Sequence, residues 1–208
     1  EEENPISVKV DLLGESGVGK TSIISQFTSN KFNPRCPTSV SAQFISKTMK
    51  FPEYNKKIKF DIWDTVGQEK YRSISKIVIN GAQIVVYVYD ITKEEHFKEL
   101  KFWCNCVEEI LGKKVILGVV ANKIDLYENQ KISKQEGEKY AEDIGALFKE
   151  TSAKNCRQQL IEFINELIEK LLVKEKLIQK EEKLILKKDE KGQQKKKKML
   201  LFLMMTTI

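Results

Sequence analysis

The residues Gly14-Glu15-Ser16-Gly17-Val18-Gly19-Lys20-Thr21 fit the spacing G-x-x-x-x-G-K-[ST], in which a glycine-rich turn wraps around phosphate groups. Glycines allow the backbone N–H groups to approach the phosphates closely, and the lysine ammonium neutralises the outer ones. The threonine hydroxyl is a ligand for Mg²⁺. The expected phosphate-binding residues are Glu15, Ser16, Gly17, Val18, Gly19, Lys20, Thr21 and Ser22. The spacing alone leaves the base and the reaction open.

The segments on both sides of this turn favour a phosphate site over a chance match. Residues 6–13 alternate and end in an apolar pair, which is typical of a buried strand. Residues 21–27 carry apolar side chains at positions 23, 24 and 27, which predicts one face of a helix. A strand, a glycine-rich turn and a helix together direct backbone N–H groups and a helix N-terminus at one anion.

Strands and helices alternate along the rest of the chain. Thr92 with Glu95, and Ser133 with Glu136, have the spacing of capping boxes at helix starts. The alternation predicts an α/β fold, with a mostly parallel six-stranded sheet, one antiparallel hairpin strand and helices on both faces. The expected strands after the first are 42–51, 57–64, 82–90, 114–121 and 146–150, and the expected later helices are 92–111, one from 133, and 158–173.

A second group of candidate residues follows the predicted strand 57–64. Asp64 is expected to hold Mg²⁺ together with Thr21, since magnesium keeps several waters and takes few protein ligands. Gly67 allows a backbone N–H to approach a γ-phosphate. Gln68 can orient a water molecule for in-line attack, which makes Gln68 and Lys20 the candidate catalytic residues.

A third group follows two later strands and indicates the base. A carboxylate at Asp125 can accept hydrogen bonds from N1–H and N2–H of guanine, whereas adenine would leave it unpaired at a cost of roughly 1–3 kcal/mol. The alternative for this segment is a simple helix cap. Three further roles are expected: Asn122 ties loops together, Lys123 lies along the base or ribose, and Ser152-Ala153-Lys154 provides an N–H to guanine O6 and a cover over the ring.

Taken together, the segments 14–21, 64–67, 122–125 and 152–154 resemble the Ras superfamily of small GTPases. The strings 62–69, 71–74 and 87–92 are similar to the Rab branch, and the resemblance covers about residues 6–173. It implies a G domain that binds GTP or GDP with Mg²⁺ and hydrolyses GTP slowly as a monomeric switch. It also implies exchange factors, GTPase-activating proteins, and effectors in vesicle traffic. Thr38 is then the expected Mg²⁺ and γ-phosphate contact of the first switch.

The sequence departs from the Rab pattern in both expected switch regions. The loop 32–38 is about one residue shorter than usual, and Val66 replaces the usual alanine beside Gly67. A β-branched residue there stiffens the chain, which predicts altered switch movement or slow hydrolysis. The alternative is therefore a scaffold that holds GTP or GDP and barely turns over. A P-loop kinase or ATPase is disfavoured by Asn122-Lys123-Ile124-Asp125.

Composition and charge distinguish the C-terminal part of the chain from the expected domain. Residues 174–198 carry the whole net charge of +6, so the expected domain 1–173 is neutral and a nucleic-acid partner is not expected. Residues 199–208 form a short apolar end. No cysteine follows Cys156, so the family's prenyl anchor is not expected, and the basic run and apolar end predict weak binding to anionic membrane. The alternative is that this end is disordered, or reflects an unusual transcript or gene model.

Four scattered cysteines and an acidic start indicate reduced thiols and no secretory leader. The expected location is the cytoplasm, with peripheral association at the cytosolic face of an intracellular membrane. The single histidine, His96, is expected to be an exposed helix residue without a catalytic part.

Overall fold

The structure is a computed structural model of the 208-residue chain, and it describes residues 4–35, 43–65 and 78–177. The chain divides into two units, Glu1–Ile168 and Glu169–Ile208. In the second unit, the described residues 169–177 are helical. The division of the sequence at residues 173 and 198 stays a prediction. None of the helices in the described part of the chain has the length and apolar character that crossing a membrane requires.

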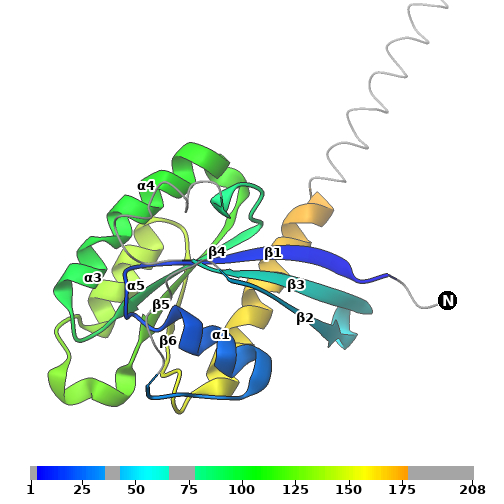
Figure 1. The fold of residues 1–208 in the computed structure, drawn as a ribbon. Coiled ribbons are helices and arrows are strands. Elements are labelled where there is room, and N and C mark those ends of the chain that lie inside the picture. The colour runs from blue at the N-terminus through cyan, green and yellow to red at the C-terminus, as the bar shows by residue number, and fades with distance from the viewer. Residues whose placement is uncertain (1–3, 36–42, 66–77, 178–208) are drawn as a thin grey trace, which may run out of the picture. The chain divides into compact units, whose positions relative to one another are not determined.

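The first unit is built on a six-stranded sheet (Figure 1). The strand order is β2-β3-β1-β4-β5-β6, in which only the β2–β3 pair is antiparallel. This confirms the expected fold class. The strands are β1 (Ile6–Leu13), β2 (Gln43–Phe51), β3 (Lys56–Asp64), β4 (Ile84–Asp90), β5 (Ile116–Asn122) and β6 (Leu147–Glu150).

Helices cover both faces of this sheet (Figure 1). On one face, Tyr87 and Tyr89 of β4 pack in a cluster with Trp103 and Val107 of α4. On the other face, Phe27 of α1 meets Phe60 of β3 edge to face at 5.5 Å. A Cβ on Gly118 of β5 would lie 2.8 Å from the Phe163 ring, so residues 157–168, which are helical, pack closely on that face. The helices are α1 (Lys20–Ser29), α3 (Glu94–Lys98), α4 (Leu100–Leu111) and α5 (Lys134–Asp143), with short 3₁₀ turns η1 (Pro52–Tyr54), η3 (Gly112–Lys114) and η4 (Ile124–Asn129).

Local sequence explains several of these elements. The continuous apolar run of β4 is buried along its whole length, as expected for a parallel strand covered on both faces. Ser133 forms the predicted capping box at the start of α5, because its hydroxyl accepts from the Glu136 N–H while the Glu136 carboxylate accepts from the Ser133 N–H.

The structure corrects three expectations around residues 92–111. The predicted capping box of Thr92 with Glu95 is wrong: α3 begins at Glu94, and the Thr92 hydroxyl donates to Asp90 instead. The expected single helix is divided at Glu99 into α3 and α4. His96 is partly buried rather than exposed, and its Nδ1 has no hydrogen-bond partner among the described residues.

Candidate nucleotide-binding site

A pocket of about 410 Å³ opens beside the carboxyl ends of the parallel strands. Two loops far apart in the sequence form most of it, the glycine-rich turn after β1 and the segment after β5. Ligands of open parallel sheets bind at this edge, because loops from neighbouring strands converge there. The lining residues are Ser16, Gly17, Gly19, Lys20, Thr21, Ser22, Phe32, Asn33, Pro34, Thr65, Asn122, Lys123, Asp125, Leu126, Ala153 and Lys154.

Two glycines of the turn are required by close approaches. At Gly14 a Cβ would lie 2.1 Å from the Val88 carbonyl oxygen, so the turn leaves β1 in direct contact with β4. Gly19 has a φ of 102° and a Cβ there would lie 2.3 Å from the Asn122 side-chain nitrogen. Only glycine combines these backbone angles with such contacts. The turn is therefore held close to β4 on one side and to Asn122 on the other.

Lys20, at the first position of α1, places one positive charge in the pocket. Its ammonium donates to the carbonyls of Gly14 at 2.7 Å and Glu15 at 3.0 Å, which folds the side chain back over the turn. Burial lowers the pKa of Lys20 to about 8, and the nearby Asp64 and Glu15 partly oppose this. Lys20 therefore remains mostly protonated at pH 7 and can neutralise phosphate charge.

Thr21 and Asp64 bring two oxygen ligands together at the same end of the pocket. The Thr21 hydroxyl donates to Asp64 Oδ2 at 2.6 Å, and Asp64 is fully buried at the end of β3. A hydroxyl and a carboxylate this close fit Mg²⁺, which prefers oxygen ligands and keeps several waters. The described residues hold no cluster of three or more His, Cys, Asp or Glu side chains that would form a protein-only metal cage.

The Asn122 side chain, at the end of β5, connects the glycine-rich turn with the segment after β6. Its Nδ2 donates to the Val18 carbonyl at 2.8 Å, and its Oδ1 accepts from the Ala153 N–H at 3.2 Å. Asn122 is 1% exposed, so both bonds are shielded from water. The expected role of Asn122 in tying loops together is therefore visible in the structure.

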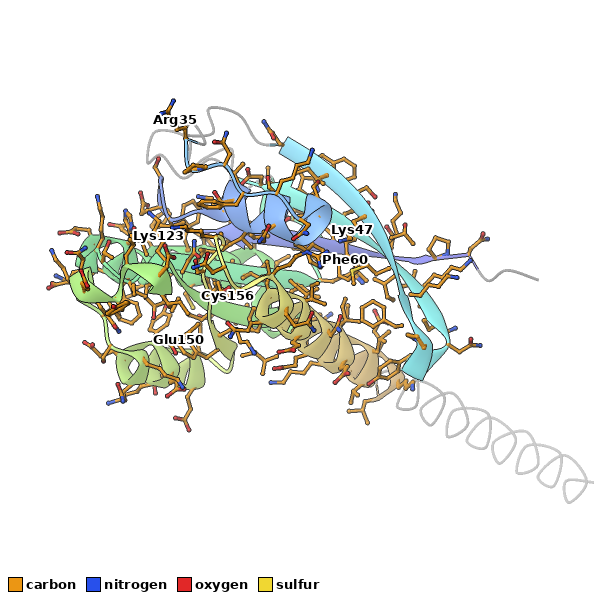
Figure 2. All side chains as sticks on the ribbon, turned by 90° about the horizontal axis from the view of Figure 1, so that it is seen from below. Arg35, Lys47, Phe60, Lys123, Glu150 and Cys156 are labelled. Carbon is orange, nitrogen blue, oxygen red and sulfur yellow. The ribbon has the colours of Figure 1, made fainter. Side chains whose placement is uncertain are left out.

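Asp125, which also lines the pocket, is held by Ser152 of the segment after β6. The Ser152 hydroxyl donates to Asp125 Oδ1 at 2.5 Å and accepts from the Lys154 N–H at 3.2 Å. Lys123, labelled in Figure 2, directly follows β5 and has a left-handed backbone with a φ of 69°. This conformation turns the chain after β5, so that Lys123 and Asp125 both line the pocket.

The structure brings most of the expected site residues together. Those that line the pocket are Ser16, Gly17, Gly19, Lys20, Thr21, Ser22, Asn122, Lys123, Asp125, Ala153 and Lys154. Four others support them through contacts: Asp64 with Thr21, Ser152 with Asp125, and the carbonyls of Glu15 and Val18 with Lys20 and Asn122. Thr38, Gly67 and Gln68, and the substitution Val66, lie outside the described residues.

Sequence reasoning missed five residues that line the pocket, namely Phe32, Asn33, Pro34, Thr65 and Leu126. Phe32 offered a signal, because a large apolar side chain in a polar loop is unusual, and it is 37% exposed. Thr65 offered none: its hydroxyl donates to the Leu12 carbonyl at 2.6 Å, a contact between residues 53 positions apart.

The fold and the pocket define an α/β domain in which a glycine-rich turn and the segment after β5 line one pocket. Comparison with known proteins identifies the class more closely. The Ras family model matches residues 9–176. "Ras-related protein Rab-21" of Canis lupus familiaris and of Homo sapiens are each 37% identical over 173 residues, which is 82% of this chain and 77% and 76% of those proteins. "Ras-related protein Rab-22A" of Homo sapiens is 38% identical over 149 residues, 72% of this chain and 76% of that protein.

The chain belongs to the Ras family. It is a Rab-like small GTPase, a switch that binds GTP or GDP with Mg²⁺ and hydrolyses GTP, and its Rab relatives are consistent with a role in vesicle traffic. Family membership also implies an exchange factor, a GTPase-activating protein and effectors as partners. The expected recognition, activity and cofactors are thereby confirmed.

Proposed function

We propose that the pocket between the glycine-rich turn and the segment after β5 is the site where this chain holds GTP or GDP. The observation that carries this assignment is the convergence of 11 expected residues on one pocket of about 410 Å³. This volume falls in the usual range for small-ligand sites. Lys20 and the N–H groups of the turn face the phosphates in this assignment, and Asp125 and the Ala153 N–H face the guanine.

Thr21 and Asp64 are the residues that would hold Mg²⁺, together with Thr38 from the first switch. The metal supplies positive charge beside the phosphates. Lys20 adds a second charge at the start of α1, where the helix N-terminus also favours an anion. In the same assignment the Gly67 N–H contacts the γ-phosphate and Gln68 orients the attacking water. Catalysis then consists mainly of positioning and charge stabilisation.

The base assignment is tested by Asp125→Asn. A carboxylate accepts from both N1–H and N2–H of guanine, whereas an amide accepts only one of them and presents an N–H₂ to the other. Xanthine has a carbonyl at C2, so the same amide can accept from N1–H and donate to that oxygen. Loss of a charge-assisted bond predicts a roughly 10- to 100-fold lower affinity for GDP and a preference for xanthosine diphosphate.

Competition between GDP and xanthosine diphosphate against a fluorescent nucleotide measures this change. Asp143→Asn, an exposed residue at the end of α5, is the matched control and should keep the wild-type preference. An Asp125→Asn variant that still prefers GDP would show that Asp125 does not read the base.

We also propose that the chain acts as a monomer at the cytosolic face of an intracellular membrane. Residues 174–198 carry 11 lysines and 5 acidic residues, and a basic segment beside the apolar residues 199–208 favours an anionic lipid surface. Sedimentation with vesicles that contain phosphatidylserine should retain the full chain at low salt and lose it at high salt. Equal recovery with purely zwitterionic vesicles would contradict an electrostatic contact.

A further inference from the structure

Asp90, the last residue of β4, has a carboxylate whose two oxygens are divided between two partners. Oδ2 lies 2.6 Å from the Lys123 ammonium, and Oδ1 accepts from the Thr92 N–H at 2.9 Å and from its hydroxyl at 2.7 Å. Asp90 is 2% exposed and does not line the nucleotide pocket. A buried carboxylate with this arrangement is oriented from one side by Thr92 and offers its other oxygen to Lys123.

Lys123 is the partner that reaches the pocket. Its side chain is 31% exposed, and it follows Asn122, which is paired with Asp90 across the β4–β5 ladder. Free lysine side chains lose up to about 2 kcal/mol of rotamer entropy when they are ordered. A lysine that is already tethered before the ligand arrives loses less of that entropy on binding.

The charges around this pair keep it ionised. Burial alone would raise the pKa of Asp90, but the hydrogen bonds from Lys123 and Thr92 outweigh it, so the pKa lies below its usual value. His96 of α3 lies close enough to interact with both residues, and burial lowers its pKa, which favours the neutral ring near pH 7. Lys93 and Glu95 are the other charged neighbours of His96. Lys123 is therefore the cation that neutralises Asp90.

We infer that Asp90 is a positioning residue for nucleotide retention, which holds the Lys123 side chain along the pocket without touching the nucleotide itself. The inference rests on the proposed function, in which the pocket lined by Lys123 and Asp125 receives the guanine nucleoside. It gives the Asp90-Ile91-Thr92 segment a role that its sequence pattern did not indicate. Thr92 fixes the carboxylate, Asp90 fixes the ammonium, and Lys123 contacts the ligand.

A double-mutant cycle of Asp90→Asn and Lys123→Met tests this chain of contacts, with dissociation of a fluorescent GDP analogue as the readout. An amide has one acceptor oxygen where the carboxylate has two, so Asp90→Asn releases either Thr92 or Lys123. We expect dissociation roughly tenfold faster in Asp90→Asn, the lower range for a lost charge-assisted bond. Lys123→Met should be at least as fast, and the double variant no faster than Lys123→Met.

A purely structural role of Asp90 would give a different result, namely the same acceleration with and without the Lys123 ammonium. That multiplicative outcome would overturn the inference. Glu138→Gln, which breaks the exposed pair with Lys134 at 3.5 Å, is the matched control and should dissociate at the wild-type rate. A fast Glu138→Gln variant would show that loss of any carboxylate is enough, and would also overturn the inference.

Thr92→Val provides a second route if Asp90→Asn does not fold. It removes the hydroxyl hydrogen bond to Oδ1 while keeping the backbone N–H bond and the Asp90 charge, and it should accelerate dissociation by a smaller factor that disappears in the Lys123→Met background. No acceleration by Thr92→Val, or one that persists beside Lys123→Met, would contradict the inference. If Lys123→Met itself dissociates at the wild-type rate, Lys123 does not contact the ligand, and the inference fails. The base preference of Asp125→Asn tests the pocket assignment separately.

Discussion

Replacing Asp11 by asparagine should stabilise the protein more at pH 8 than at pH 5. Asp11 lies in the middle of β1, paired with Trp63 of β3 and Val85 of β4, and it is fully buried. Neither carboxyl oxygen has a hydrogen-bond partner among the described residues. Burial raises the pKa of Asp11 from 3.8 to about 7, and the charge of Lys9 opposes this only in part. The Lys9 ammonium is engaged with the Asn80 carbonyl at 2.6 Å.

The sign and size of the effect follow from proton linkage. Between pH 3.8 and about 7 the folded chain keeps a proton on Asp11 that the unfolded chain has released. The folded state is therefore favoured at low pH and loses this advantage as pH rises toward 7, after which the loss is constant. Integration gives a loss of about 2–3 kcal/mol between pH 5 and pH 8. This is a large part of a total stability that is typically 5–15 kcal/mol.

Urea unfolding at both pH values, with saturating GDP and Mg²⁺, measures the effect. The free energy of unfolding of the wild type minus that of Asp11→Asn should fall by about 2–3 kcal/mol from pH 5 to pH 8, since groups common to both proteins cancel. Asp143→Asn, which removes an exposed carboxylate, is the matched control and should show no such change. A difference between wild type and Asp11→Asn that is the same at both pH values would refute the argument from burial.

Three further predictions concern the nucleotide site. Gly19→Ala places a Cβ 2.3 Å from the Asn122 amide nitrogen at a residue with a positive φ, so it should weaken GDP binding more than tenfold. Circular dichroism should show that the fold is retained, and wild-type affinity for GDP would contradict the argument from this contact. Asn122→Ala removes two buried hydrogen bonds and should lower the affinity for GDP by about 2 kcal/mol, measured by calorimetry. A loss below about 0.5 kcal/mol would mean that the two segments keep their positions without the Asn122 side chain. Gln68→Leu should abolish hydrolysis stimulated by a GTPase-activating protein in a phosphate-release assay, and unchanged stimulation would remove Gln68 from the mechanism.

Local sequence patterns predicted the parts of this fold that depend on neighbouring residues. The bounds of β1 agree with the alternation from Ile6 to Leu13. The capping box at Ser133 was predicted from two residues three positions apart. The glycine-rich turn and the Asp125 segment were also recognised from the sequence, because each pattern consists of a few consecutive residues. Lys20, Thr21 and Asp125 all line one pocket.

The features that local sequence patterns did not specify depend on which side chains meet in the folded chain. The Asn122 amide meets the Val18 carbonyl across 104 positions, and no local period indicates which loop it contacts. Thr92 has the spacing of a helix cap, but its hydroxyl donates to the Asp90 carboxylate instead of capping the helix. Asp11 occupies an apolar position of a buried strand, where sequence alone gives no indication that its carboxylate lacks a partner.

The two hydrogen bonds of Asn122 hold the glycine-rich turn and the segment after β6 in one preorganised arrangement. In the proposed assignment, a guanine nucleotide is a bivalent ligand for this arrangement, with one covalent linker between its phosphates and its base. Once the phosphates are in place, the base is presented to Asp125 at a high effective concentration, and the reverse also holds. Guanosine and pyrophosphate added separately lack this advantage. An exchange factor therefore need not oppose both groups at once, because displacing either loop reduces the retention of the other.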